Sequence, residues 1–104
     1  MSNAQAQNGN VPVIVAAARI AANGTIVAQD GGIASVVNGP VGTYQINLLH
    51  EAEVTRIQPI VTPAGTGDDL VAEVIMPTAS IVTVSITAGG VDSDAEFRLM
   101  LLKW

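Results

Sequence analysis

The sequence predicts an all-β protein that folds as one antiparallel β-sandwich domain. Three observations lead to this prediction. Valine, isoleucine and threonine are abundant, no long segment repeats apolar residues at helical spacing, and short apolar runs alternate with turn residues. The chain of 104 residues has the length of a single domain, and no internal repeat or linker divides it.

About eight strands are expected, at intervals of roughly 10 residues, which is typical of a jelly roll or a related sandwich. The turn "GPVG" (residues 39–42) should join the third strand to the fourth, and residues 50–55 should form a polar connection or one helical turn. The expected strands are residues 13–22, 25–29, 33–38, 43–49, 56–63, 70–76, 80–87 and 95–104.

Five residues carry further predictions about these strands. Asn23 and Gly24 should form a two-residue hairpin turn, because both residue types tolerate a positive φ. Pro59 has no N–H to donate, so its strand should lie at a sheet edge or contain a bulge, and Pro77 should end the sixth strand. Tyr44 should be buried at the start of its strand, with its hydroxyl reaching water or a backbone acceptor at the end of the sheet.

The last strand is apolar on both faces after Arg98. Phe97, Leu99 and Leu101 alternate with outward positions along the strand. Such a strand should be central in its sheet, with one face in the core and the other against a neighbouring subunit. Cover by the N-terminal segment of the same chain is the alternative. The predicted subunit-interface residues are Met100, Leu102 and Trp104.

Composition favours an oligomer and excludes several classes of partner. The chain is 49% hydrophobic and 12% charged, against a usual charged share of about 25%, so apolar surface should remain to be buried. The net charge is −5 and the four cations are scattered, so no nucleic-acid binding is expected. The chain has no cysteine for a disulfide framework and no apolar run near the ~20 residues of a membrane span.

No residue set in the sequence matches an enzyme or a cofactor site. His50, with Glu51 and Glu53 beside it, has no "GxSxG" turn elsewhere to supply a nucleophile, so it is interpreted as a surface histidine. The acidic loops contain Asp68, Asp69, Asp92 and Asp94, whereas a calcium site needs six to eight oxygens. We therefore expect no metal, with Asp92 in a turn and Asp94 as an Asx-type cap before the last strand.

Three stretches in order, "GTYQINL", "IQPIVTP" and "VTVSITAGGVDSDAEFRLMLL", resemble the trimeric jelly-roll family that includes the globular heads of complement and tumour necrosis factor. The version in phage tail-fibre, collar and capsid-decoration proteins is most similar. It has a "GxYxVxF" strand, a "PxVxVTP"-like strand and a final "DxxFxFxV" strand. The matching residues are Gly42, Tyr44, Ile46 and Leu48, then Ile57, Pro59, Val61 and Pro63, then Asp94, Phe97, Leu99 and Leu101.

The resemblance implies a homotrimer in which the last strand packs toward the threefold axis. It also implies a structural virion protein, assembled in the host cytoplasm and attached to a major capsid protein or a tail-fibre protein. A capsid decoration or cement protein, or a small knob, fits a chain of one domain. The alternative is the tip domain of a tail fibre that binds a receptor or host glycan through Asp68, Asp69, Asp92 and Asp94.

The N-terminal residues 1–10 are polar and do not form a signal-peptide pattern. We expect a flexible arm there and the sandwich domain at residues 11–104. In a capsid-bound trimer this arm would dock onto the shell. The candidate docking residues are Ser2, Asn3, Gln5 and Gln7.

Overall fold

The computed structural model describes residues 13–65 and 69–104, so the expected N-terminal arm lies outside the described residues. Nine strands and one short 3-10 turn occur in the described part. They are β1 (Val13–Ile20), β2 (Ile26–Gln29), β3 (Ile33–Asn38), β4 (Thr43–Leu48), η1 (Val54–Arg56), β5 (Ile57–Pro63), β6 (Leu70–Thr78), β7 (Ile81–Ala88), β8 (Val91–Asp92) and β9 (Phe97–Lys103).

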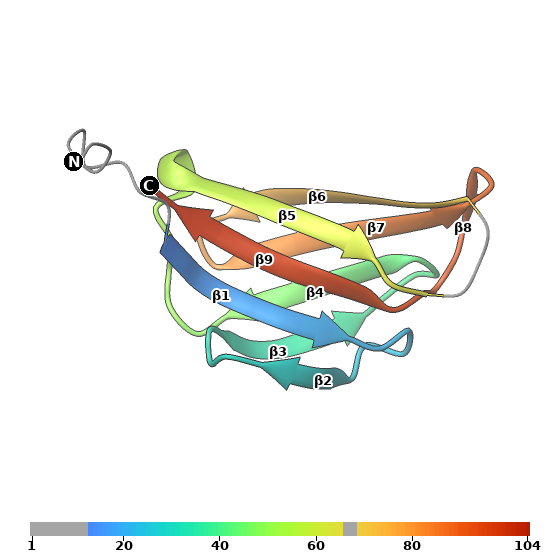
Figure 1. Cartoon of the computed structure of the whole chain (residues 1–104), viewed down its shortest axis with the longest axis horizontal. Helices are drawn as coiled ribbons and strands as arrows, with labels where there is room; N and C mark the ends of the chain where they lie inside the picture. Colours follow the sequence, from blue (N-terminus) through green and yellow to red (C-terminus); the bar gives the residue numbers. More distant parts are fainter. Residues whose placement is uncertain (1–12, 66–68) are drawn as a thin grey trace, which may run out of the picture.

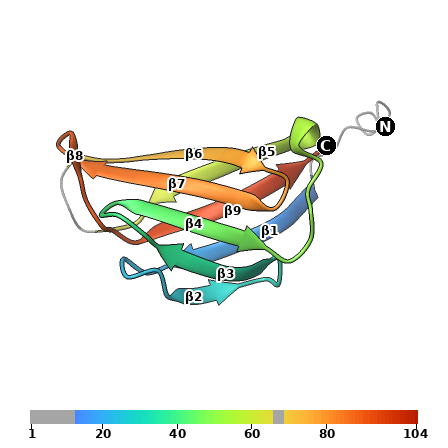
Figure 2. The same ribbon diagram turned by 180° about the vertical axis from the view of Figure 1, so that it is seen from behind.

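The strands form two antiparallel sheets that pack face to face, so the predicted all-β sandwich is confirmed. One sheet has the strand order β2-β1-β9-β5 and lies toward the viewer in Figure 1. The other has the order β3-β4-β7-β6, with β8 paired to β7, and faces the viewer in Figure 2. We call them the β9 sheet and the β7 sheet. Within residues 13–65 and 69–104, no helix is long and apolar enough to cross a membrane.

The core lies between the sheets and is built by alternate residues of the central strands. In β9 the residues Phe97, Leu99 and Leu101 are buried, as predicted. The ring of Tyr44 from the β7 sheet meets the ring of Phe97 from the β9 sheet edge to face, with centroids 4.8 Å apart. Aromatic pairs prefer this arrangement, in which the positive edge of one ring meets the negative face of the other. The largest fully buried side chains are Tyr44, Phe97, Ile20, Ile46, Ile86, Leu101, Val82 and Val84.

Several predictions about strand pairing are confirmed. The third and fourth predicted strands pair through the residue 39–42 turn. The last strand is central, between β1 and β5. Pro59 lies in β5, which is an edge strand of the β9 sheet, so its missing N–H interrupts no ladder on the outer side.

The first hairpin differs from the prediction. Its loop runs from Ala21 to Thr25, because Ile20 is the last residue of β1 and pairs with Ile26 of β2. The N–H of Gly24 donates to the carbonyl of Ala21 at 2.9 Å, and the N–H of Ala21 donates to the carbonyl of Thr25 at 2.8 Å. Gly24 has a positive φ and Asn23 does not, so a two-residue turn was wrong and a longer turn takes its place.

Two further strand boundaries differ from the prediction. Pro77 does not end the sixth strand, because β6 continues to Thr78 with a register shift after Ile75. A proline is tolerated there because β6 is an edge strand and the shift leaves it outside the regular ladder. The expected loop after β7 contains β8, which pairs with β7 through a turn whose residues Gly89 and Gly90 both have positive φ. Two positive φ values are the requirement of a type I′ hairpin turn, and the described part of the chain has nine strands where about eight were expected.

Candidate functional site

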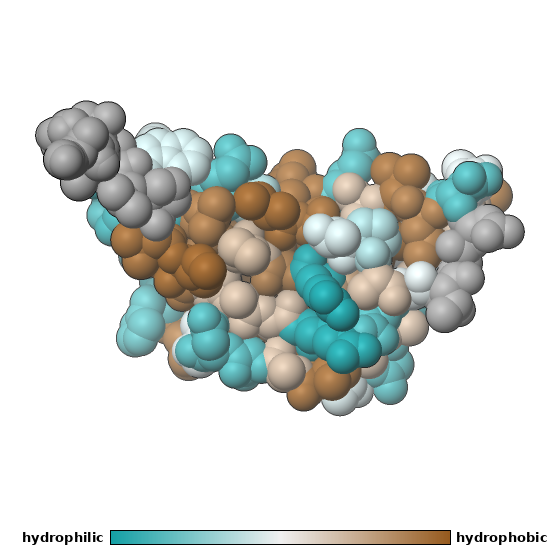
Figure 3. Space-filling model, in the orientation of Figure 1, coloured by the Kyte–Doolittle hydropathy of each residue, from teal (hydrophilic) through white to brown (hydrophobic). Residues whose placement is uncertain are grey.

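The outer surface of the β9 sheet carries an apolar face, which we define as Ile14, Ala17, Ile60, Met100 and Leu102. Cross-strand register places these residues in two neighbouring rows: Ile14 and Leu102 are partners, and Ala17, Met100 and Ile60 are partners. Figure 3 shows the corresponding brown area over β1, β9 and β5. Side chains opposite one another in antiparallel strands lie close together, so the two rows make one continuous surface.

The opposite sheet has a different outer surface. The central strands β4 and β7 direct polar side chains outward there, and apolar side chains occur mainly on the edge strands. The outward residues of the two central strands include Gln45, Asn47, Thr83 and Ser85. A sheet face that meets water should have polar residues at its centre. The β7 sheet has this pattern, whereas the central strands of the β9 sheet direct Ala17, Met100 and Leu102 outward along one part of their length.

A positively charged row adjoins the apolar face. Arg19 and Arg98 are cross-strand partners in the next row along β1 and β9, and Figure 3 shows a teal area at this place. The side chain of Arg19 donates to the carboxylate of Glu96, and this hydrogen bond raises the pKa of Arg19. Like charges in opposite positions repel, so Glu96 offsets part of this repulsion.

The predicted interface residues differ in exposure. Met100 is 36% exposed and Trp104 is 41% exposed, whereas Leu102 is half-buried between β1 and β5. The prediction from the sequence did not include Ile14 or Ile60. Ile14 lies on this face because a bulge in β1 shifts the register before Ala16, and no local pattern marks that bulge. Ile60 could have been found from the alternation of β5, in which exposed Ile60 lies between half-buried Pro59 and Val61.

The predicted histidine region lies at the end of the sandwich where β9 finishes. His50, Glu51 and Glu53 are all exposed, and they border a cavity of about 260 Å³ between the two sheets. No serine, threonine, cysteine or tyrosine occurs among the residues that line this cavity. The described part of the chain also contains no group of three or more His, Cys, Asp or Glu side chains that could hold a metal ion.

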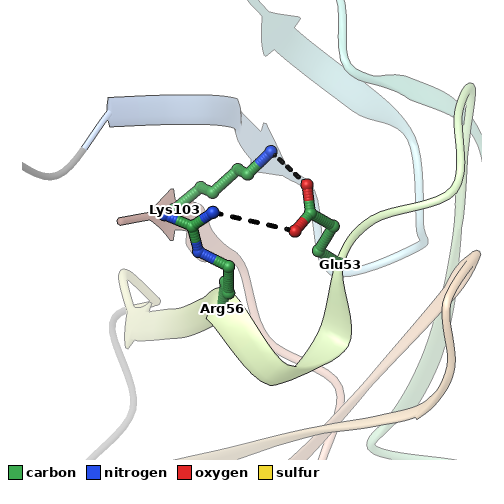
Figure 4. A network of polar contacts seen from close by, with 3 residues as sticks. All are labelled: Glu53, Arg56 and Lys103. Atoms are coloured by element: carbon green, nitrogen blue, oxygen red, sulfur yellow. Dashed lines mark hydrogen bonds and ion pairs between the residues drawn. The ribbon is translucent and has the colours of Figure 1, made fainter.

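Glu53 and Lys103, which line this cavity, belong to an ion-pair network with Arg56 (Figure 4). Lys103 Nζ donates to Glu53 Oε1 at 2.7 Å, and Arg56 lies 3.9 Å from Glu53 Oε2. The hydrogen bond from Lys103 lowers the pKa of Glu53. The network therefore links Glu53, in the polar segment after β4, to Lys103, the last residue of β9.

The acidic loop residues that the structure describes, Asp69, Asp92 and Asp94, do not form one group. Asp69 and Asp92 are exposed near the β7–β8 turn, where the N–H of Gly89 donates to the carbonyl of Asp69 at 3.2 Å. Asp92 belongs to β8, so its assignment to a turn was wrong. Asp94 accepts the N–H of Gly42 at 2.7 Å and also contacts Asn38. Asp94 therefore accepts a backbone N–H as predicted, but from the distant β3–β4 turn and not as a local Asx cap.

The remaining predicted residues, Asp68 and the docking residues Ser2, Asn3, Gln5 and Gln7, lie outside the described residues. No family model, curated protein or solved structure matches this chain.

Proposed function

We propose that the protein is a non-enzymatic structural subunit of a phage particle, assembled in the host cytoplasm, and that it forms a homotrimer through the apolar face. The observation that carries self-association is the pair of rows of apolar side chains on an outer sheet surface, directed there mainly by the central strands β1 and β9. The jelly-roll and virion parts of the proposal rest on the resemblance of the three strand motifs. In this role the trimer is a capsid decoration or cement protein, or a small knob, attached to a major capsid or tail-fibre protein.

The geometry of the face supports association of copies. The face combines exposed Ile14 and Met100 with half-buried Leu102. Association that buries these apolar side chains is favourable, because it removes their surface from water. A stable interface of standard size buries about 800 Å² on each partner. The strands β1, β9 and β5 lie side by side and carry the residues that would form this contact.

The mass of the full chain in solution tests this part of the proposal. We expect a trimer at micromolar concentration, and we expect Leu102→Asp and Met100→Asp to dissociate it, because each buries a carboxylate in the contact. The matched control is Gln45→Asp, which adds the same charge to the centre of the opposite sheet surface. A wild-type monomer, or equal dissociation by all three variants, contradicts the proposal.

The location on the particle needs a separate measurement. Imaging of virions that carry the protein should show protrusions at threefold positions of the shell for a decoration protein, and on the tail for a knob. Particles that lack the protein should break at lower temperature or lower force than complete particles. Equal stability of the two kinds of particle contradicts a cement role.

A tail-fibre tip that binds a receptor or host glycan is a second proposal. The observation in its favour is that Asp69 and Asp92 are both exposed beside the turn at Gly89. Binding of the isolated chain to a glycan array, with loss of binding in Asp69→Ala and Asp92→Ala, would support it. Absence of binding to glycans and to host cells favours the particle-stabilising role.

A further inference from the structure

The cavity at the end of the sandwich has an apolar floor and a polar rim. Its volume is about 260 Å³. Leu48, Ile57 and Leu101 belong to the floor, and they come from β4, β5 and β9. The rim contains His50, Glu51, Ala52, Glu53 and Lys103.

Small residues line part of the cavity, so their side chains do not fill it. Backbone hydrogen bonds fix the segments that form its wall. Ala16, Gly32 and Ala52 have no side chain long enough to fill the space. A Cβ atom at Gly32 would lie 2.5 Å from the Cβ of Ala16, so no larger residue fits at Gly32 without a backbone shift. The N–H of Leu49 donates to the carbonyl of Gly32 at 3.2 Å, and the N–H of Ala52 donates to the carbonyl of Ala79 at 2.8 Å.

Trp104 lies beside this cavity without lining it. It follows Lys103, which is part of the rim, and its backbone N–H donates to the carbonyl of Arg56 at 3.3 Å. It is the only tryptophan of the chain, and its exposed fraction is 41%. Figure 1 places the C-terminus at the end of the sandwich where η1 and the start of β5 also lie. The exposed ring of Trp104 and the apolar floor of the cavity therefore lie at the same end of the molecule.

We propose that the indole of Trp104 inserts into this cavity of a second copy of the chain. The inference rests on the proposed self-association and names a contact that anchors it. The apolar floor suits the ring, and the carboxylate of Glu51 at the rim can accept a hydrogen bond from the indole N–H. Since Trp104 and the cavity lie at one end, each copy can provide one ring and receive another in a closed assembly.

Continuity with the apolar face also favours a second copy as the occupant. Val15 lines the cavity, and it is the residue next to Ile14 of the apolar face. One contact can therefore cover the face and fill the cavity. Tryptophan in a well-packed pocket is among the residues that contribute most to protein–protein binding.

The fluorescence of the full chain tests insertion, because all tryptophan emission comes from Trp104. A dilution series across the association range should show blue-shifted, acrylamide-protected emission in the assembly and red-shifted emission in the monomer. Ala52→Leu, which fills the cavity from its rim, should restore red-shifted emission and weaken association by about tenfold or more. The matched control Ala34→Leu, an exposed position of β3, should change neither.

The outcomes separate this inference from the proposed function. If the chain associates while its emission does not change with concentration, insertion is wrong and the trimer stands. If the chain is monomeric at every concentration, self-association itself is wrong. If Ala52→Leu shifts the emission of the diluted monomer as much as that of the assembly, the ring belongs to its own chain and insertion into a second copy is wrong. Circular dichroism establishes that Ala52→Leu is folded, and Trp104→Ala, which should weaken association to the same extent, provides a second variant.

Discussion

Asp94 and Gly42 are 52 positions apart in the chain, yet the Asp94 Oδ1 atom accepts the backbone N–H of Gly42 at 2.7 Å. The Oδ2 atom of the same carboxylate accepts from Asn38 Nδ2 at 3.3 Å. Asn38 ends β3 and Gly42 precedes β4, whereas Asp94 leads into β9. One carboxylate therefore ties a turn of the β7 sheet to the segment that enters the β9 sheet.

Removal of this carboxylate should destabilise the fold. We expect Asp94→Ala to lower the free energy of unfolding by about 1–2 kcal/mol, because the N–H of Gly42 loses a charged acceptor. Asp94→Asn keeps an acceptor oxygen and should lower the free energy less. Urea denaturation measures both values. Asp92→Ala, at an exposed position two residues earlier, should stay within about 0.5 kcal/mol of the wild type. An equal decrease in the free energy of unfolding for Asp92→Ala and Asp94→Ala would contradict the contribution of this hydrogen bond to stability.

Gly42 should not tolerate a side chain. Its φ is +80°, and a Cβ atom would lie 2.5 Å from the carbonyl oxygen of Ile86 and 2.9 Å from the backbone nitrogen of Ser93. We expect Gly42→Ala to lower the free energy of unfolding by about 2 kcal/mol or more, since a left-handed conformation and a backbone clash add together. Gly39→Ala in the same turn has open space around it, and thermal unfolding should find it within about 1 kcal/mol of the wild type. Equal effects of the two substitutions would contradict this account.

The hydroxyl of Tyr44 makes hydrogen bonds with two backbone groups. It donates to the carbonyl of Ala22 at 2.7 Å and accepts the N–H of Ala95 at 3.1 Å. Tyr44→Phe should lower the free energy of unfolding by about 1–3 kcal/mol, because the N–H of buried Ala95 is left without its partner. Ser85→Ala, which also removes one hydroxyl but from an exposed position, should change it by no more than about 0.5 kcal/mol. Chemical denaturation of the three proteins decides the prediction.

The same residue should make stability depend on alkaline pH. Burial raises the pKa of Tyr44 above its ordinary value of 10.0. The unfolded chain then releases the phenol proton at a lower pH than the folded chain, so this part of the stability is complete below about pH 10 and is lost as the pH rises through the folded pKa. Denaturation between pH 8 and 11 should show a decline that is smaller in Tyr44→Phe. Phenolate absorbance reports the folded pKa directly, because the chain has one tyrosine; a native midpoint at or below that of the unfolded chain would contradict the prediction.

The ion pair with Lys103 should make stability depend on the titration of Glu53 at acid pH. The hydrogen bond from Lys103 lowers the pKa of Glu53. Stability from this pair is therefore present above the pKa of an unfolded glutamate, about 4.3, and is lost as the pH falls through the folded value. Lys103→Met should raise the pKa of Glu53, as followed by carbon NMR of its carboxyl group, and Lys103→Arg should raise it less. A midpoint that does not change in Lys103→Met would show that the pair does not form in solution.

Much of the fold could be predicted from local pattern. The alternation of residues 43–48, 81–88 and 97–103 identified strands whose buried residues include Tyr44, Val82 and Phe97. Pro59 indicated a strand at a sheet edge or with a bulge, because a residue without an N–H cannot pair on both sides, and β5 is an edge strand. Turn chemistry was less reliable. The glycine pair after β7 closes a hairpin that was expected to be a loop, and the loop after β1 is longer than its Asn-Gly signal indicated.

By itself, the sequence predicted all the strands except β8, the apolar faces of those strands and the central place of β9, because side-chain alternation is a property of one strand. Only the tertiary structure decided which distant residues meet. Sheet order and register placed Arg19 opposite Arg98, a bulge in β1 put Ile14 on the apolar face, and the sandwich end enclosed the cavity beside Trp104. Register between strands depends on the packing of two sheets and on irregularities in their ladders. No single segment contains that information, so the candidate surface became complete only when the strands were assembled.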